Sequence, residues 1–83
     1  MTLQASNDDP PVSGFAIDGL LSDTVDLPRI TRCIWVGVAG NVRVLYANDT
    51  VPVTLVGVQG QKSGAFRRIY STGTTASNIV GEV

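Results

Sequence analysis

Apolar and β-branched residues gather in short runs along the chain, and polar turn residues separate one run from the next. The clearest runs are residues 31–39, 42–47, 51–58, 65–71 and 78–83. They recur at intervals of about ten residues, and no window shows the 3.6-residue period of an amphipathic helix. This pattern predicts an all-β fold, a small antiparallel β-sandwich or barrel.

The two runs on either side of Gly40-Asn41 predict a hairpin. TRCIWVGVA (31–39) is apolar at both sets of alternating positions, which predicts a central strand covered on two faces. VRVLYA (42–47) follows, and Gly-Asn has the composition of a two-residue hairpin turn. We therefore expect two antiparallel strands joined at Gly40-Asn41.

Three further segments complete the expected sheet. Pro52 lies near the start of VPVTLVGV (51–58), which predicts either a strand beginning or an edge strand, because proline cannot donate a ladder hydrogen bond. GQKSG (60–64) predicts a loop before the strand of residues 65–71. FAIDGLL (15–21) predicts a strand-like segment.

The first fourteen residues, MTLQASNDDPPVSG, differ in composition from the rest. Pro10 and Pro11 disfavour both a helix and a central strand, so we expect an extended N-terminal arm over residues 1–14. A free tail and an arm that docks on a neighbouring molecule are both open. Residues 15–83 are expected to form a single β domain.

Composition limits how so short a chain can be stabilised. With 83 residues it forms one domain at most, and domains of this size bury a modest fraction of their surface. Cys33 is the only cysteine and there is no histidine, which excludes an internal disulfide and makes a His/Cys metal site unlikely. Charged residues make up 16% of the chain, below the usual share of about 25%. Association with other chains is the support that remains.

Charge and hydropathy argue against nucleic-acid and membrane partners. The formal net charge is −1, so the chain has no basic field that would attract nucleic acid. No apolar run approaches the ~20 residues of a transmembrane helix, and the N-terminus lacks the features of a secretory signal. A single free cysteine fits a reducing compartment, so the expected site of synthesis and assembly is a cytoplasm.

The stretch STGTTASN (71–78) raises the question of catalysis, because it is rich in hydroxyl groups. A phosphate-binding loop would need a lysine and a following helix, and a nucleophile elbow would need Gly-x-Ser-x-Gly. The stretch has none of these, and the chain has no histidine to act as a base. We interpret it as a turn whose small residues let a strand or a neighbouring chain approach closely.

Two other sets of residues could carry chemistry. Asp18, Asp23 and Asp26 could form an acid–base group, although turn and capping roles explain them better. Cys33 is a weak candidate for a reactive thiol, because we expect no activating base beside it. We expect no enzyme activity, no cofactor and no metal.

The predicted strands carry aromatic and basic residues that could form one strip: Trp35, Tyr46, Phe66 and Tyr70 with Arg67 and Arg68. Interfaces between proteins favour aromatic side chains and arginine, and a strip of the two could also bind single-stranded nucleic acid. The candidate subunit or partner interface consists of Trp35, Phe66, Arg67, Arg68, Tyr70 and Gly73. Arg67 and Arg68 are adjacent and should point to opposite faces, so at least one is expected to meet a partner's carboxylate or carbonyl.

Three segments, taken in order, resemble a known family. They are SDTVDLPRITR (22–32), VGVAGNVRV (36–44) and RRIYSTGTTASNIV (67–80). This pattern resembles the spike base proteins of tailed phages and gene transfer agents, small virion proteins that sit on the head and support a spike or fibre. The resemblance covers residues 15–83 and leaves the arm outside.

The resemblance implies a structural virion protein, a decoration of the capsid head without catalysis. It would form a homo-oligomeric ring, with a pentamer at the capsid vertices as the leading choice. The ring would bridge the major capsid protein to a spike or fibre protein, on the surface of a particle assembled in a bacterial host. The alternative is a small β-barrel that binds carbohydrate or single-stranded nucleic acid, for which Trp35 and Tyr70 should be exposed together on one surface.

Overall fold

The structure is a computed structural model, and it describes residues 13–83. Its elements are β1 (Gly14–Ala16), a short 3₁₀ helix η1 (Asp18–Leu20), β2 (Cys33–Tyr46), β3 (Val53–Ser63), β4 (Phe66–Ile69) and β5 (Ser77–Glu82). The strands form one antiparallel sheet in the order β1-β5-β2-β3, and β4 also pairs with β2. The all-β prediction is confirmed. Residues 1–12 of the expected arm lie outside the described residues.

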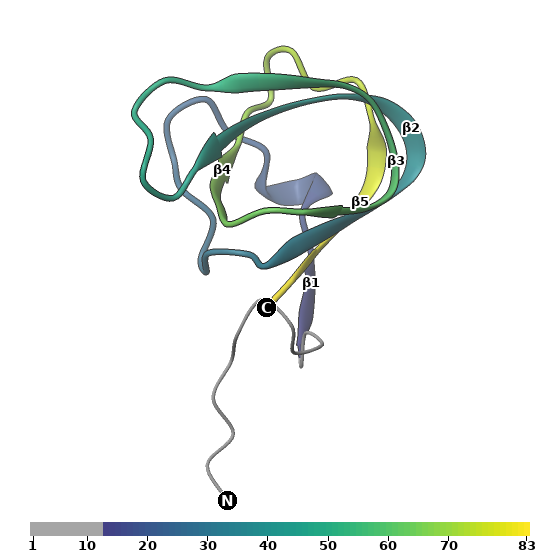
Figure 1. The fold of residues 1–83 in the computed structure, drawn as a ribbon, viewed down its shortest axis with the longest axis horizontal. Helices are drawn as coiled ribbons and strands as arrows, with labels where there is room; N and C mark the ends of the chain where they lie inside the picture. The colour runs from purple at the N-terminus through teal and green to yellow at the C-terminus, as the bar shows by residue number, and fades with distance from the viewer. Residues whose placement is uncertain (1–12) are drawn as a thin grey trace, which may run out of the picture.

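Strand β2 organises the sheet because it pairs with three others. One of its edges faces β3 almost throughout, while β5 and β4 share the other edge, β5 along residues 33–38 and β4 along residues 44–46. Its first residue, Cys33, pairs with Ser63, and its last, Tyr46, pairs with Phe66, three residues farther along the chain. The two ends of β2 therefore come close together, and Figure 1 shows the resulting curled, barrel-like ring.

Thr31 joins the segment just before β2 to the connection between β3 and β4. Its hydroxyl donates to the carbonyl of Gly64 at 3.1 Å and accepts from the backbone N–H of Phe66 at 3.2 Å. Its own N–H donates to the Phe66 carbonyl at 3.1 Å. Thr31 is buried, so these bonds satisfy groups that have little access to water.

The predicted hairpin at Gly40-Asn41 is wrong, because both residues lie inside β2. The register between β2 and β3 instead shifts on each side of Gly40, and these irregularities bend the strands without a chain reversal. The predicted loop at residues 60–64 is also wrong for residues 60–63, which belong to β3. Gly57 and Gly60 have φ angles of +67° and +73°, so the glycines of this region serve a bent strand.

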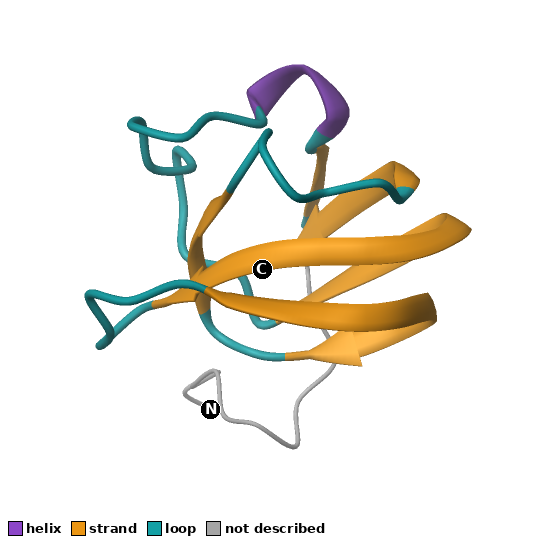
Figure 2. Cartoon of the chain, turned by 90° about the horizontal axis from the view of Figure 1, so that it is seen from above, coloured by secondary structure: helices purple, strands orange, loops and turns teal. Residues whose placement is uncertain are grey.

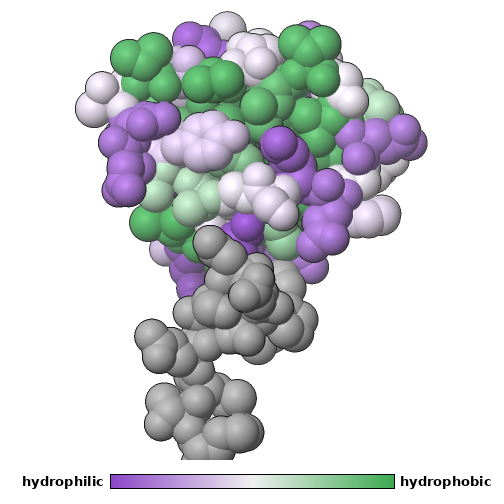
Figure 3. Space-filling model, in the orientation of Figure 1, coloured by the Kyte–Doolittle hydropathy of each residue, from purple (hydrophilic) through white to green (hydrophobic). Residues whose placement is uncertain are grey.

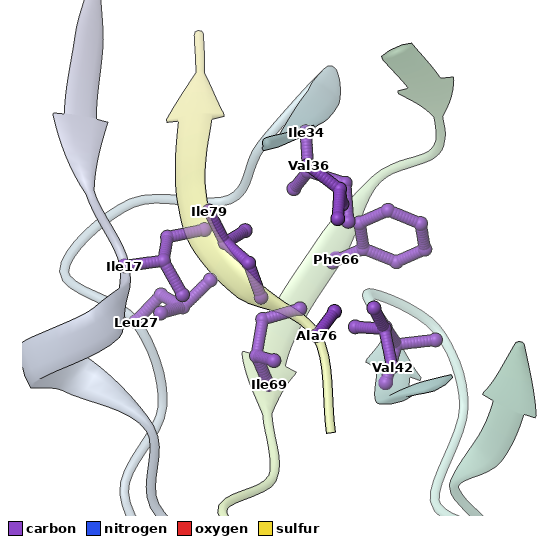
Figure 4. Close-up of a cluster of buried hydrophobic side chains, with 10 residues drawn as sticks. Ile17, Leu27, Ile34, Val36, Val42, Phe66, Ile69, Ala76 and Ile79 are labelled. Carbon is purple, nitrogen blue, oxygen red and sulfur yellow. The ribbon is translucent and has the colours of Figure 1, made fainter. Parts of the chain in front are cut away.

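The core lies inside the curl of β2 and β3. Its largest fully buried side chains include Phe66, Ile17, Ile34, Ile69 and Ile79. Figure 4 shows these side chains pointing toward one another from β2, β4, β5 and Ile17, which directly precedes η1. The Tyr46 ring packs edge-on against Phe66 with centroids 4.9 Å apart. Inward-facing residues of β2 behave as the alternation predicts, since Ile34, Val36, Val42 and Val44 are all buried.

The outer face of β2 differs from the prediction of a strand covered on both sides. Trp35 is 51% exposed, so the described chain covers its side of the strand only in part. Val38, which the register of β5 places on the same face as the buried Val36, is also 48% exposed. The strand-like segment of residues 15–21 is also only partly correct, because β1 ends at Ala16 and η1 follows. Figure 2 shows η1 beside the strands, on the side where connecting loops also lie. No helix among residues 13–83 is long and apolar enough to cross a membrane.

Candidate functional site

The loop of residues 70–76 fills a gap in the sheet. Between the parts of β2 that pair with β5 and β4, hydroxyl groups of the loop replace a strand. Thr75 Oγ1 accepts from the N–H of Asn41 at 2.8 Å, and Thr74 Oγ1 accepts from the N–H of Arg43 at 3.0 Å. The N–H of Thr75 donates back to the Asn41 carbonyl at 2.8 Å. Two hydroxyl groups of STGTTASN, those of Thr74 and Thr75, thus bond the backbone of β2.

Small residues are required where this loop crosses β2. A Cβ atom on Gly40 would lie 2.6 Å from the backbone nitrogen of Ala76, far inside normal contact distance. Gly73 has a φ of +93°, and a Cβ there would lie 3.1 Å from Cδ of Arg43. The expected close approach of a strand at this stretch is therefore seen, and within residues 13–83 the approaching strand is β2 of the same chain.

Two of the resembling segments, SDTVDLP and RRIYST, are bonded to each other. Asp23 accepts three hydrogen bonds from the end of the second segment: from Ser71 Oγ at 3.2 Å, from the Thr72 N–H at 2.9 Å and from Thr72 Oγ1 at 2.5 Å. Main-chain bonds run alongside, from the Ser22 N–H to Ile69 and from the Leu27 N–H to Arg67. We call this arrangement of residues 22–27 against 67–72 the clasp.

Asp26 closes the other end of the clasp with two arginines. Arg68 Nε donates to Asp26 Oδ1 at 2.8 Å, and Arg67 Nη1 lies 3.3 Å from Oδ2. Arg67 also donates to the Asp49 carbonyl at 2.7 Å, and Arg68 to the Asp23 carbonyl at 3.3 Å. The two arginines therefore converge on one carboxylate of their own chain, whereas the sequence predicted opposite directions and a partner's acceptor.

The Tyr70 ring of the clasp lies close to two guanidinium groups. The guanidinium carbon of Arg43 lies 4.8 Å from the centroid of the Tyr70 ring, and that of Arg68 lies 5.6 Å from it. Tyr70 is only 9% exposed, so its ring is a packing element. The prediction that Trp35 and Tyr70 would be exposed together fails for Tyr70.

The three aspartates do not form an acid–base group. Asp18 accepts from the N–H groups of Asn78 and Ile79, each at 3.0 Å, and so caps the start of β5, while Asp23 and Asp26 serve the clasp. Each carboxylate is thus occupied by donors from its own surroundings, which is the turn and capping role that the sequence favoured. Among the described residues, no group of three or more His, Cys, Asp or Glu could hold a metal ion.

The same hydrogen bonds lower the pKa values of the clasp carboxyls. Donation from the Thr72 side chain and backbone holds the pKa of Asp23 below its ordinary value of 3.8. The hydrogen bond from Arg68, with the charges of both arginines, holds the pKa of Asp26 below the same value. The charged forms are favoured in the fold, so these carboxylates stabilise it only while they are ionised.

We expect the clasp to weaken in acid. Because the folded pKa values lie below 3.8, the contribution is fully present above that pH and is lost as the pH falls below it through the folded values. Urea unfolding from about pH 6 to about pH 2 should show a smaller acid loss in an Asp23→Asn/Asp26→Asn variant. Asp49→Asn is the matched control, because Asp49 meets Arg67 through its backbone oxygen. Equal acid losses in all three proteins would contradict the assignment.

Cys33 is held as a neutral thiol. Its sulfur donates to Glu82 Oε1 at 3.2 Å and accepts from Gln61 Nε2 at 3.3 Å. Burial is the main cause that raises the pKa of the thiol above its ordinary value, and the Glu82 carboxylate adds to it. The residue therefore lacks the thiolate character of a nucleophile.

The six predicted interface residues occupy three different environments. Trp35 stands on the outer face, Phe66 is wholly buried in the core, and the other four belong to the clasp and the adjoining loop. Trp35 lies in a row of cross-strand partners, between Val80 of β5 and Gln61 of β3. Val80 is 37% exposed, so it belongs to the same partly exposed surface as Trp35. Residue types could not predict this pairing, because it depends on the register between β2 and β5.

Comparison with known proteins gives one informative likeness. No family model matches the sequence, and no curated protein matches it. The fold is similar to a chain of the solved structure "Capsid of native GTA particle computed with C5 symmetry", with a TM-score of 0.83 and 28% sequence identity. The likeness covers 96% of this chain and 92% of the other, so it extends over nearly the whole of both.

Proposed function

We infer that this chain is a structural protein of a virion-like particle, the oligomeric base of a spike or fibre on the capsid head. The observation that carries the proposal is the likeness to a chain in the capsid structure of a GTA particle, over 96% of the present chain at 28% identity. The sequence resemblance to spike base proteins of phages and gene transfer agents points the same way.

The arrangement of the polar side chains supports a structural role without catalysis. Hydroxyl groups of residues 71–75 and the carboxylates of Asp18, Asp23 and Asp26 all bond neighbours within the fold. The effect is to hold the loop of residues 71–76 and the segment of residues 17–27 rigidly against the sheet. A rigid small module is what a load-bearing particle component requires.

The proposed ring fits both the neighbour and the surface. The neighbouring structure was computed with C5 symmetry, which suits a fivefold ring at capsid vertices. A cyclic ring joins one face of each subunit to a different face of the next. The outer row with Trp35 and Val80 supplies an exposed aromatic anchor of the kind found at the centre of interfaces. The clasp arginines face their own chain, so we propose Trp35 as the principal contact residue.

Native mass spectrometry of the full chain tests the ring, and Trp35→Ala tests its contact. We expect a homo-oligomer whose dissociation constant rises at least about thirtyfold on Trp35→Ala, because hot-spot residues contribute roughly 2 kcal/mol or more. Ile30→Ala is the control, since Ile30 is also exposed but lies outside this row. A monomer at all concentrations would contradict the ring, and an unchanged oligomer in Trp35→Ala would remove the contact.

A further inference from the structure

Strand β3 presents a long edge without a partner in the described chain. It runs for 11 residues, pairs only with β2 and stands last in the strand order. Its sequence, VTLVGVQGQKS, contains one charged residue, Lys62, and no proline. Val56 is 78% exposed, and Figure 3 shows apolar residues in green along the upper side of the molecule, where Figure 1 places part of β3. Proteins normally protect such an edge with charges, proline or a cover.

A hollow lies along this edge. It is lined by Leu55, Val56, Gly57, Val58, Gln59, Gln61 and Lys62, all of which belong to β3. Successive side chains of a strand point to opposite faces of the sheet. The hollow is lined by residues of β3 alone, so no second strand of the described chain borders it. Gly57, one of the lining residues, and the nearby Gly60 have positive φ angles, which bend the strand there.

The other end of the sheet leads into the N-terminal arm. β1 stands first in the strand order, and Ser13 extends its pairing through two hydrogen bonds with Val83, at 3.1 and 2.8 Å. At least nine residues precede Pro10, which is enough to follow most of the 11 residues of β3, while Pro10 and Pro11 cannot donate to a ladder and would form the connection to β1. The arm carries Asp8 and Asp9, and β3 carries one lysine, so the two segments are complementary in charge.

We propose that the N-terminal arm of one copy lies along the β3 edge of a second copy, as an added strand with Asp8-Asp9 near Lys62. β1 and β3 are opposite ends of the strand order, so each copy offers an arm at one end and an acceptor edge at the other. Such head-to-tail contacts close into rings, and added strands bind through main-chain hydrogen bonds. The inference rests on the proposed oligomer and identifies what links its subunits.

Pairwise disulfide trapping tests the link. Full-length Asp9→Cys is co-expressed with a tagged chain that carries cysteine in place of Val53, Val56, Gln59 or Lys62. After mild oxidation, peptide mass spectrometry is expected to find a disulfide between the two chains for at least one of these positions. The control is Asp9→Cys with Ile30→Cys, because Ile30 is exposed elsewhere. This pair should stay unlinked.

The possible outcomes separate the link from the oligomer. An oligomer by native mass without any arm–β3 disulfide would overturn the arm inference and leave the proposed ring standing. A monomeric Asp9→Cys/Val56→Cys chain with an internal disulfide would show that the arm covers its own β3, which also overturns it. A monomer without either disulfide would contradict the ring as well.

A charge swap gives an independent test in the full chain. Lys62→Glu is expected to weaken self-association about two- to fivefold, as for an exposed ion pair, and the loss should shrink at high salt. Adding Asp8→Lys and Asp9→Lys to Lys62→Glu should restore association. Arg29→Glu, an equal charge change at an exposed residue outside β3, is the control. The link would be contradicted if Lys62→Glu associated as tightly as Arg29→Glu and if the added Asp8→Lys and Asp9→Lys changes did not strengthen its association.

Discussion

Phe66→Ala is expected to lower the free energy of unfolding by about 3–5 kcal/mol, the usual cost of removing a large buried aromatic side chain. Phe66 is fully buried and packs edge-on against Tyr46. Its N–H also donates to the hydroxyl of Thr31, which joins the two ends of the curled sheet. Alanine keeps this N–H, so the expected loss comes from the cavity and from the lost contact with the Tyr46 ring.

Urea unfolding monitored by circular dichroism measures this loss. Domains of this size have roughly 5–10 kcal/mol of stability in total, so a substantial fraction of Phe66→Ala should be unfolded at low denaturant. Val51→Ala is the control, because Val51 is 70% exposed and should change stability by less than about 0.5 kcal/mol. A loss below about 1 kcal/mol for Phe66→Ala would contradict the assignment of Phe66 as the centre of the core.

Gly40→Ala is expected to destabilise the fold by about 3 kcal/mol, the upper part of the usual range for overpacking. The added Cβ would meet the backbone of Thr75 and Ala76 at 2.6–2.9 Å. That backbone cannot retreat freely, because the N–H groups of Thr75 and Ala76 both donate to the Asn41 carbonyl. Removing this steric clash would require breaking the hydrogen bonds between the Thr74 and Thr75 hydroxyls and the backbone of β2.

Gly19→Ala is the matched control for this substitution. A Cβ on Gly19 would meet no atom within 4 Å, so the same chemical change should alter stability by less than about 0.5 kcal/mol. The two variants are compared by their urea midpoints at equal slope. If Gly40→Ala were as stable as Gly19→Ala, the loop could not cross β2 as closely as described.

Periodicity predicted most strands, and it failed where a glycine signal had two meanings. Gly-Asn marks a hairpin turn in many sequences, but Gly40-Asn41 lies inside a bent strand because the loop of residues 71–76 crosses there. Gly60 likewise has a positive φ within β3 rather than in a loop. Both outcomes depend on contacts between distant segments, which a short window of sequence does not contain.

The clasp could not be predicted from local sequence patterns, because its contacts join segments that are far apart in the sequence. Asp23 and Thr72 are 49 residues apart, and Asp26 and Arg68 are 42 apart. Each segment was conspicuous alone, as carboxylates in a turn or as paired arginines, but residue type cannot tell which carboxylate meets which donor. The exposure of Trp35 was also hidden, because an apolar alternation looks the same whether or not a neighbour covers its outer face.

We propose that this chain is a ring-forming structural component of a capsid head. Cryo-electron microscopy of particles from cells that encode it, compared with particles from cells lacking it, tests the claim most directly. The account predicts density on the outside of the head vertices that fits the curled sheet in several copies around the symmetry axis, and its loss without the chain. Particles with identical vertices in both preparations, and the chain found only as free protein, would contradict it.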